Sequence, residues 1–166
     1  MIKLTTYTSL IFLFITLLAC RKHTNNPCDG ILNESPPKKI GILLYHKATG
    51  DNLVLSNPIE ETDIKVVALP SGNTINNWRL LKSANSPFNG MLEMAVFHEK
   101  AEQHSYKIEI KGMGTFAIAY SISQEKTDDP CKTYTYPMSG LKSTDHDFEQ
   151  LVLQDKPIPN IIKVYF

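Results

Sequence analysis

The side chains best suited to hold a metal ion or exchange protons are five histidines. None stands in the HExxH or HxH spacing that brings two imidazoles to one face of an element. His98 and His104 flank a predicted turn between two strands, and histidines opposed across such a hairpin can bind a transition metal. A solvated hairpin tip is the favoured interpretation, because polar residues usually occupy such tips.

A second polar cluster is Asp145-His146-Asp147, three ligand-type side chains in a row. A strand would place both aspartates on one face, but calcium takes roughly six to eight oxygen ligands, more than this stretch supplies. The pattern favours a polar turn that caps the next element. We therefore predict no metal and no cofactor; a metal site would require His98, His104, Asp145 and His146 to converge.

Catalytic patterns are equally sparse. No serine stands in a GxSxG elbow, and the sequence holds no glycine-rich phosphate loop. A glycosidase-like pair of carboxylates depends on distance in space, so the sequence leaves that arrangement open. Glu93 and Glu109, however, fall where predicted strands face solvent. The prediction is that the protein is not an enzyme.

Aromatic residues are the remaining candidates for ligand binding. Trp78 is the single tryptophan and lies beside two asparagines and Arg79. An exposed tryptophan with such neighbours can stack on a sugar ring, although a lone tryptophan in a strand usually packs inside. Tyr134 and Tyr136 alternate onto one face of a predicted strand. Exposure of Trp78 or of this tyrosine pair would distinguish a carbohydrate-binding protein from a structural one.

The elements that carry these residues are predicted to be short strands. Apolar residues recur at every second position, most regularly over 104–111 and 115–123, and no ten-residue segment has helical periodicity. Segment 148–153 is ambiguous, because Thr144 and Asp147 could cap a short helix there. The expected strands are residues 40–47, 53–55, 63–69, 75–81, 91–98, 104–111, 115–123, 131–137 and 161–166.

Strands at about ten-residue spacing, separated by glycine and proline turns, are typical of a β-sandwich or barrel. We predict an all-β fold, an antiparallel β-sandwich of seven to nine strands over residues 40–166, with an immunoglobulin-like or transthyretin-like topology.

The N-terminus has the layout of a secretory signal peptide over residues 1–19. Lys3 supplies positive charge, residues 10–18 are apolar, and the small residue Ala19 precedes Cys20. Residues 4–19 are too short and too polar for a membrane span, which needs about 20 mostly apolar residues.

Leu17-Leu18-Ala19-Cys20 resembles the lipobox of bacterial lipoproteins. In that family the cysteine thiol receives a diacylglycerol, the signal is cut before the cysteine, and the new amino group is acylated. The resemblance implies that Cys20 is the lipidated first residue of the mature chain. The alternative is an ordinary cleaved signal that leaves Cys20 as a free thiol. Residues 20–39, polar and marked by prolines, then read as a tether.

The residues after the cysteine refine the expected location. Arg21-Lys22-His23 lack the aspartate that retains enteric lipoproteins in the inner membrane. Residues 47–53 are similar to a strand-and-turn sequence found in small envelope lipoproteins of Bacteroidota. In that group, acidic residues soon after the cysteine mark export to the surface, and this chain has none there. The resemblance implies an outer-membrane protein that faces the periplasm.

If Cys20 carries lipid, Cys28 and Cys131 remain, and two thiols in an oxidising envelope most simply pair. The alternative is a pair of free thiols. A disulfide would close a loop of about 100 residues, for which the chain-entropy model gives about 4.7 kcal/mol. The eight residue steps from Cys20 to Cys28 would then hold the body within about 25–30 Å of the membrane.

Charge is balanced, with 17 basic and 17 acidic residues, so no basic patch indicates a nucleic-acid partner. We therefore expect a lipid-anchored cell-envelope protein with a non-catalytic binding or structural β-sandwich, whose partner is a protein or a glycan. A carbohydrate-binding module for glycan uptake is the alternative, and a metal-binding protein or enzyme is the third.

Overall fold

The computed structural model describes Cys28, Asp29 and residues 36–97 and 100–166. The predicted signal peptide, the lipobox with Cys20, most of the predicted tether and His98 lie outside those ranges. Residues 34–166 form one compact unit, which is described here by itself. Within the described ranges, no helix combines the length and apolar character needed to cross a membrane.

The regular elements described in this unit are β-strands, apart from one helical turn, α2 (Leu53–Ser56), and a 3-10 turn, η1 (Glu61–Asp63). The strands are β1 (Lys38–Tyr45), β2 (Ile64–Leu69), β3 (Thr74–Ile75), β4 (Trp78–Leu81), β5 (Met91–Val96), β6 (Glu102–Ile110), β7 (Gly114–Ile122), β8 (Glu125–Lys126), β9 (Tyr134–Thr135), β10 (Met138–Ser143), β11 (Asp147–Leu153) and β12 (Lys156–Tyr165).

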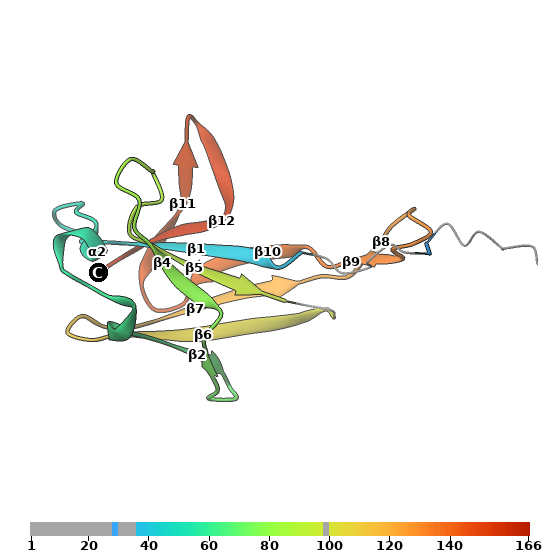
Figure 1. Ribbon diagram of the computed structural model, residues 1–166, viewed down its shortest axis with the longest axis horizontal. Coiled ribbons are helices and arrows are strands. Elements are labelled where there is room, and N and C mark those ends of the chain that lie inside the picture. Colours follow the sequence, from blue (N-terminus) through green and yellow to red (C-terminus); the bar gives the residue numbers. More distant parts are fainter. Residues whose placement is uncertain (1–27, 30–35, 98–99) are drawn as a thin grey trace, which may run out of the picture. The chain divides into compact units, whose positions relative to one another are not determined.

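Ten of these strands form two five-stranded sheets (Figure 1). Sheet A has the order β11-β12-β1-β5-β4, and sheet B has the order β10-β7-β6-β2-β3. The first and last strands, β1 and β12, pair in parallel, and the neighbouring pairs β1–β5 and β11–β12 are antiparallel. The predicted all-β sandwich is confirmed.

The main core lies between the two sheets. Strand β6 shows why: Tyr106, Ile108 and Ile110 are buried, whereas Lys107 and Glu109 between them are partly exposed. Because side chains alternate along a strand, every second one points inward. The paired strand β7 has the same alternation, and its Phe116 lies opposite Ile108. Burial of this alternating face against sheet A is the main stabilising contribution of the fold.

Strand β1 is buried on both faces, which explains its continuous apolar run. Ile40 and Ile42 face the main core, whereas Leu43 belongs to a second cluster on the outer face of sheet A. The buried members of this outer cluster are Leu43, Met91 and Leu151, and half-buried side chains surround them. Gly41 leaves the necessary space, since a Cβ there would lie 2.5 Å from the sulfur of Met91.

Strands β11 and β12 form a hairpin that departs from a regular ladder. Its turn residues Gln154 and Asp155 have φ of 51° and 60°, as a type I′ turn requires. The register shifts between Gln150 and Val152, and Asn160 on the opposite strand has φ of 61°. Such a bulge bends a hairpin and increases its twist. In Figure 1 the tip of the hairpin rises away from sheet B.

Several local predictions differ from the structure. Residues 53–55 form the turn α2 instead of a strand, because the side chain of Asn52 accepts hydrogen bonds from the backbone amides of Val54 (3.0 Å) and Leu55 (3.3 Å). Segment 75–81 divides into β3 in sheet B and β4 in sheet A. Short strands such as β3, β8 and β9, and the unpredicted β10, bring the described strands to twelve, above the expected seven to nine.

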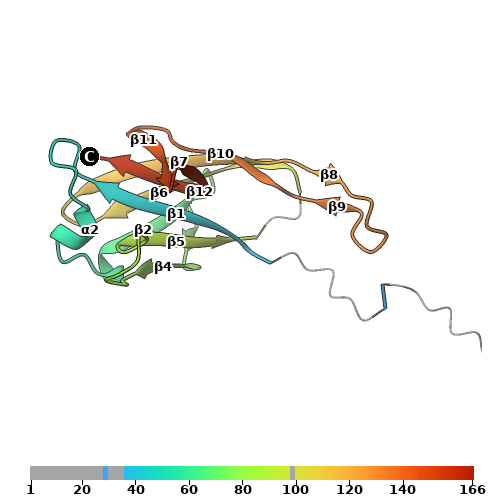
Figure 2. The same ribbon diagram turned by 90° about the horizontal axis from the view of Figure 1, so that it is seen from above.

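The ambiguous segment 148–153 is strand β11, so no helix follows Asp147. Most of segment 131–137 is turn and irregular structure, and only Tyr134 and Thr135 are extended. They pair with β8 in a ribbon that projects beyond both sheets, at the end opposite α2 (Figure 2).

Candidate functional site

Trp78 lies at the start of β4 and is half-buried against the main core. Its indole N–H donates to the backbone carbonyl of Ile75 at 2.9 Å. The polar edge of the ring is therefore used within the fold, as expected for a tryptophan that packs inside. The structure gives Trp78 a packing role, and the residue remains partly exposed.

A pocket of about 360 Å³ is lined by Trp78 and by Lys39, Asn76, Asn77, Arg79, Glu93 and Ala95. Glu93 on the central strand β5 receives Arg79 from one neighbouring strand at 2.7 Å and Lys39 from the other at 3.3 Å. These cross-strand ion pairs occupy the charges that a ligand would need. The arrangement stabilises sheet pairing and does not suggest a binding site.

The two tyrosines do not form an exposed pair. Tyr134 is 44% exposed on the β8–β9 ribbon. Tyr136 is half-buried and packs against the main core. A stacking platform made of both rings would need both to face solvent, so Tyr134 alone is available to a partner.

His104 lies on the inner face of β6, where its ring stacks on Tyr120 with centroids 5.2 Å apart. Burial lowers the pKa of this histidine, although nearby Glu102 acts in the opposite direction. Its Nε2 lies 3.3 Å from a carboxylate oxygen of Glu102. The stacking of its ring on Tyr120 gives His104 a packing role.

His146 stands at a different place in the sandwich. Its ring packs on Phe166 with centroids 4.5 Å apart and meets the edge of Phe116 at 6.3 Å. Phe116 precedes Tyr120 by four residues on β7, which separates the surroundings of His146 and His104 by about 13 Å along the strand. In the part of the chain described, no three histidine, cysteine or acidic residues gather as metal ligands.

Ser143, Asp145 and His146 resemble a catalytic triad in composition but not in geometry. Asp145 Oδ1 lies 3.1 Å from His146 Nδ1, as in a triad. The Ser143 hydroxyl, however, donates to the same aspartate at 3.3 Å and accepts from the backbone N–H of His146. The serine therefore sits on the aspartate side of the ring, away from the Nε2 that would have to activate it.

Asp145 instead holds two strands together. Its carboxylate accepts the backbone N–H of Ala117 on β7 at 2.9 Å. Burial alone would raise the pKa of Asp145, but the hydrogen bonds from Ala117, His146 and Ser143 outweigh burial and hold the pKa below its usual range. The sequence prediction of a polar turn before the next element agrees with this geometry, and that element is a strand.

Cys28 and Cys131 are disulfide-bonded, as predicted. Cys131 lies in the connection between β8 and β9 and belongs to neither large sheet. Within residues 34–166, the disulfide is therefore attached to the projecting ribbon and to neither large sheet.

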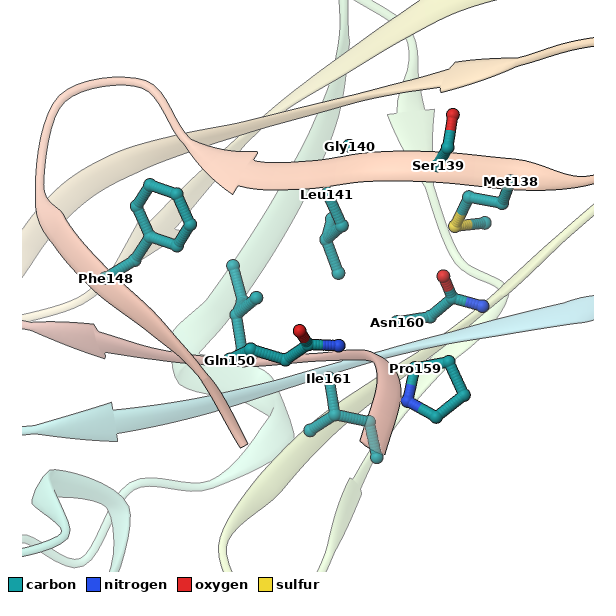
Figure 3. A pocket seen from close by; sticks show the side chains of 10 residues that line it. Met138, Ser139, Gly140, Leu141, Phe148, Gln150, Pro159, Asn160 and Ile161 are labelled. Atoms are coloured by element: carbon teal, nitrogen blue, oxygen red, sulfur yellow. The ribbon is translucent and has the colours of Figure 1, made fainter. Parts of the chain in front are cut away.

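A groove at the open edge of the sandwich is the most promising site. It lies between β10, the edge strand of sheet B, and the β11–β12 hairpin at the edge of sheet A (Figure 3). We call it the edge groove; its volume is about 330 Å³. It is lined by Met138, Ser139, Gly140, Leu141, Phe148, Gln150, Pro159, Asn160, Ile161 and Ile162.

The groove exists because both of its rims are irregular. On one side, β10 shifts register between Ser139 and Lys142 around Gly140, which has φ of 66°. On the other side, the hairpin is bulged at Asn160. The extra residues lie on β10 and on β12, and bulges of this kind re-aim side chains and bend the strands that carry them.

Figure 3 shows how the lining side chains are directed. Leu141 points down into the groove, and the ring of Phe148 faces it from β11. The amides of Gln150 and Asn160 turn into the same space. Gln150 is fixed there, because its Nε2 donates to the carbonyl of Ile158 at 3.2 Å. The groove thus combines an apolar floor, one aromatic ring and two amides, without a charged side chain among its lining residues.

Sequence reasoning did not identify this groove. Its residues come from three strands, of which β10 was not predicted and β11 was ambiguous. Proline next to asparagine at 159 and 160 hinted at a break in the last strand, but not at the strand that would face it.

Comparison with family models, with curated proteins and with solved structures finds no match to this chain. The class that can be stated is that of the fold, an all-β sandwich with an open groove at one edge.

Proposed function

We propose that this chain is a lipid-anchored protein of the cell envelope whose β-sandwich binds a ligand without catalysis. The anchor is supported by Leu17-Leu18-Ala19-Cys20 at the end of an apolar stretch that Lys3 precedes. Several acyl chains on Cys20, at about 0.8 kcal/mol per buried CH₂, would make the attachment effectively permanent.

The disulfide between Cys28 and Cys131 supports a location outside the cytoplasm. Such bonds persist in oxidising compartments and are rare where thiols are kept reduced. We assign the protein to the periplasmic side of the outer membrane, with the tether of residues 20–39 between lipid and sandwich.

The binding role rests on the edge groove. Its volume of about 330 Å³ falls within the size range of ligand pockets. The aromatic ring of Phe148 at its rim favours the second candidate, a carbohydrate-binding module, because sugar rings stack on exposed aromatic faces. The groove replaces Trp78 as the site at which such a module would bind.

The anchor is tested by labelling growing cells with an alkyne analogue of palmitate and separating membranes from soluble protein. We expect the wild-type chain to be labelled and membrane-bound, and Cys20→Ala to be unlabelled. Cys28→Ser is the matched control, since it removes a different cysteine and should leave the lipid in place. An unlabelled wild-type chain would contradict the proposed anchor.

A further inference from the structure

We propose that the edge groove binds neutral sugar units, with the Phe148 ring as the stacking surface and the Asn160 amide as a hydrogen-bonding group. This inference rests on the proposed binding function of the sandwich and names the ligand class and the residues. The groove is defined by ten residues on β10, β11 and β12.

The edge groove has an uncharged lining. None of the ten lining residues is charged, although charged residues make up 20% of the chain. A phosphate, carboxylate or ammonium group that entered this groove would lose hydration without meeting an opposite charge, which is unfavourable. Hydroxyl groups, by contrast, can exchange water for the side-chain amides of Gln150 and Asn160.

Asn160 combines an unusual backbone conformation with an amide that points into the groove. Its φ of 61° is in the left-handed region, where glycine is the least strained residue. The side chain makes no hydrogen bond to any described residue, so the fold does not use its amide. Non-glycine residues in this region collect at functional sites. An asparagine that meets the backbone requirement of the bulge and directs its amide into a groove is suited to hold a ligand hydroxyl.

Phe148 presents a partly exposed aromatic ring at the groove. It is 43% exposed and lies on the groove side of β11, where its position opposite Val164 would normally put a buried residue. Part of this residue is therefore accessible from solvent. An accessible aromatic face beside amides provides the apolar and polar contacts that a sugar ring requires, because its axial hydrogens are apolar and its hydroxyls are polar.

An extended peptide is the competing ligand, because β10 and β11 are sheet edges. Strand addition needs a regular row of backbone donors and acceptors. The β10 edge is broken by a bulge between Ser139 and Lys142, and the β11 edge belongs to a hairpin bent by the extra residues of β12 between Pro157 and Ile162. Bulges of this kind interrupt pairing and protect edges from added strands. Recognition through side chains is therefore favoured over strand addition.

The test uses the full mature lipoprotein in lipid nanodiscs and isothermal titration calorimetry. The probes are the neutral hexasaccharides of glucose (α-1,4 and β-1,4), mannose and N-acetylglucosamine, with hexagalacturonate as an anionic probe and a hexapeptide of alternating valine and threonine. We expect at least one neutral hexasaccharide to bind with a Kd below about 1 mM, and the anionic sugar and the peptide to bind at least about tenfold more weakly.

Two variants assign the binding to the groove. Phe148→Ala should weaken the preferred hexasaccharide by about tenfold or more. Asn160→Gly keeps the left-handed backbone and removes only the amide, so it should leave the melting temperature unchanged or higher and weaken binding by about three- to tenfold. Val152→Ala is the matched control. Val152 is 51% exposed on the same strand and does not line the groove, so its removal should leave the Kd unchanged.

Failure to detect any neutral hexasaccharide at about 10 mM would overturn the inference. Tighter binding of hexagalacturonate or of the peptide would also overturn it, as would equal effects of Phe148→Ala and Val152→Ala. The proposed anchor is independent of these results, because palmitate labelling of Cys20 does not depend on the groove.

Discussion

Leu151 offers a direct test of how the β11–β12 hairpin is held against sheet A. This side chain is 3% exposed in the outer cluster, where its buried companions are Leu43 and Met91. Replacement by alanine removes three carbon groups, worth about 2.4 kcal/mol at about 0.8 kcal/mol each. Leu153 and Ile158 nearby are only half-buried and can relax into part of the space. The expected loss is therefore about 2–3 kcal/mol, the lower half of the range for such cavities.

The assay is equilibrium urea unfolding, followed by circular dichroism, of the mature chain with Cys20→Ala to keep it soluble. The matched control is Val152→Ala, one residue further along the same strand but 51% exposed. It should change the free energy of unfolding by less than about 0.5 kcal/mol. Alternation along β11 thus predicts different outcomes for two adjacent apolar residues.

A loss below about 1 kcal/mol at Leu151, or equal losses at Leu151 and Val152, would refute the assignment of an outer core. Either result would mean that the hairpin projects freely and that sheet A has a solvated outer face. Hydrogen exchange of the hairpin amides separates local release from global unfolding, because release of the hairpin alone would accelerate exchange only there.

Three further predictions concern other regions. Asp145→Ala should lower stability by about 1–2 kcal/mol at pH 7, because the partly exposed carboxylate accepts several hydrogen bonds. The folded state lowers the pKa of Asp145, so the stabilisation is complete above the unfolded pKa of about 3.9 and is lost as pH falls through the folded pKa. In acid titrations, the difference in free energy of unfolding between wild type and variant should therefore shrink below about pH 4. Reduction of the disulfide at Cys28 and Cys131 should add about 2 Da without loss of the β-sheet circular dichroism signal, since Cys131 is outside both large sheets; a collapse of that signal would be the contrary result. Changing Gln154-Asp155 to Asn-Gly should raise the free energy of unfolding by about 1 kcal/mol, because both turn residues have positive φ, and an unchanged urea midpoint would contradict this.

Local patterns predicted the strands that bury one face. Strands β6 and β7 agree with segments 104–111 and 115–123 to within two residues at each end, because strict alternation leaves a single choice of inner face. Strand β5 was also expected. The prediction of a strand at 53–55 was wrong because the Asn52 side chain caps the following amides, a local bond that outweighs β propensity.

The edge groove could not be predicted in the same way. Its residues are separated by up to 24 positions, from Met138 to Ile162, and meet only because β10 and β11 are the edges of different sheets. Trp78, which the sequence did single out, is turned inward by its bond to Ile75. The sequence shows the residue types, but the packing of the two sheets decides which of these residues are exposed and which residues are their neighbours.

By itself, the sequence determined the all-β class, the inward faces of the long strands and the pairing of the two cysteines, and it carries the lipobox that motivates the proposed anchor. These properties depend on neighbouring residues or on simple chemistry, so they can be read along the chain. Only the tertiary structure decided that the outer face of sheet A carries a second core, that His104 and His146 stay apart, and that bulges on β10 and β12 border a neutral groove beside Phe148. Those properties depend on which strands become neighbours, and strand order follows from the packing of the whole chain, which no local segment specifies.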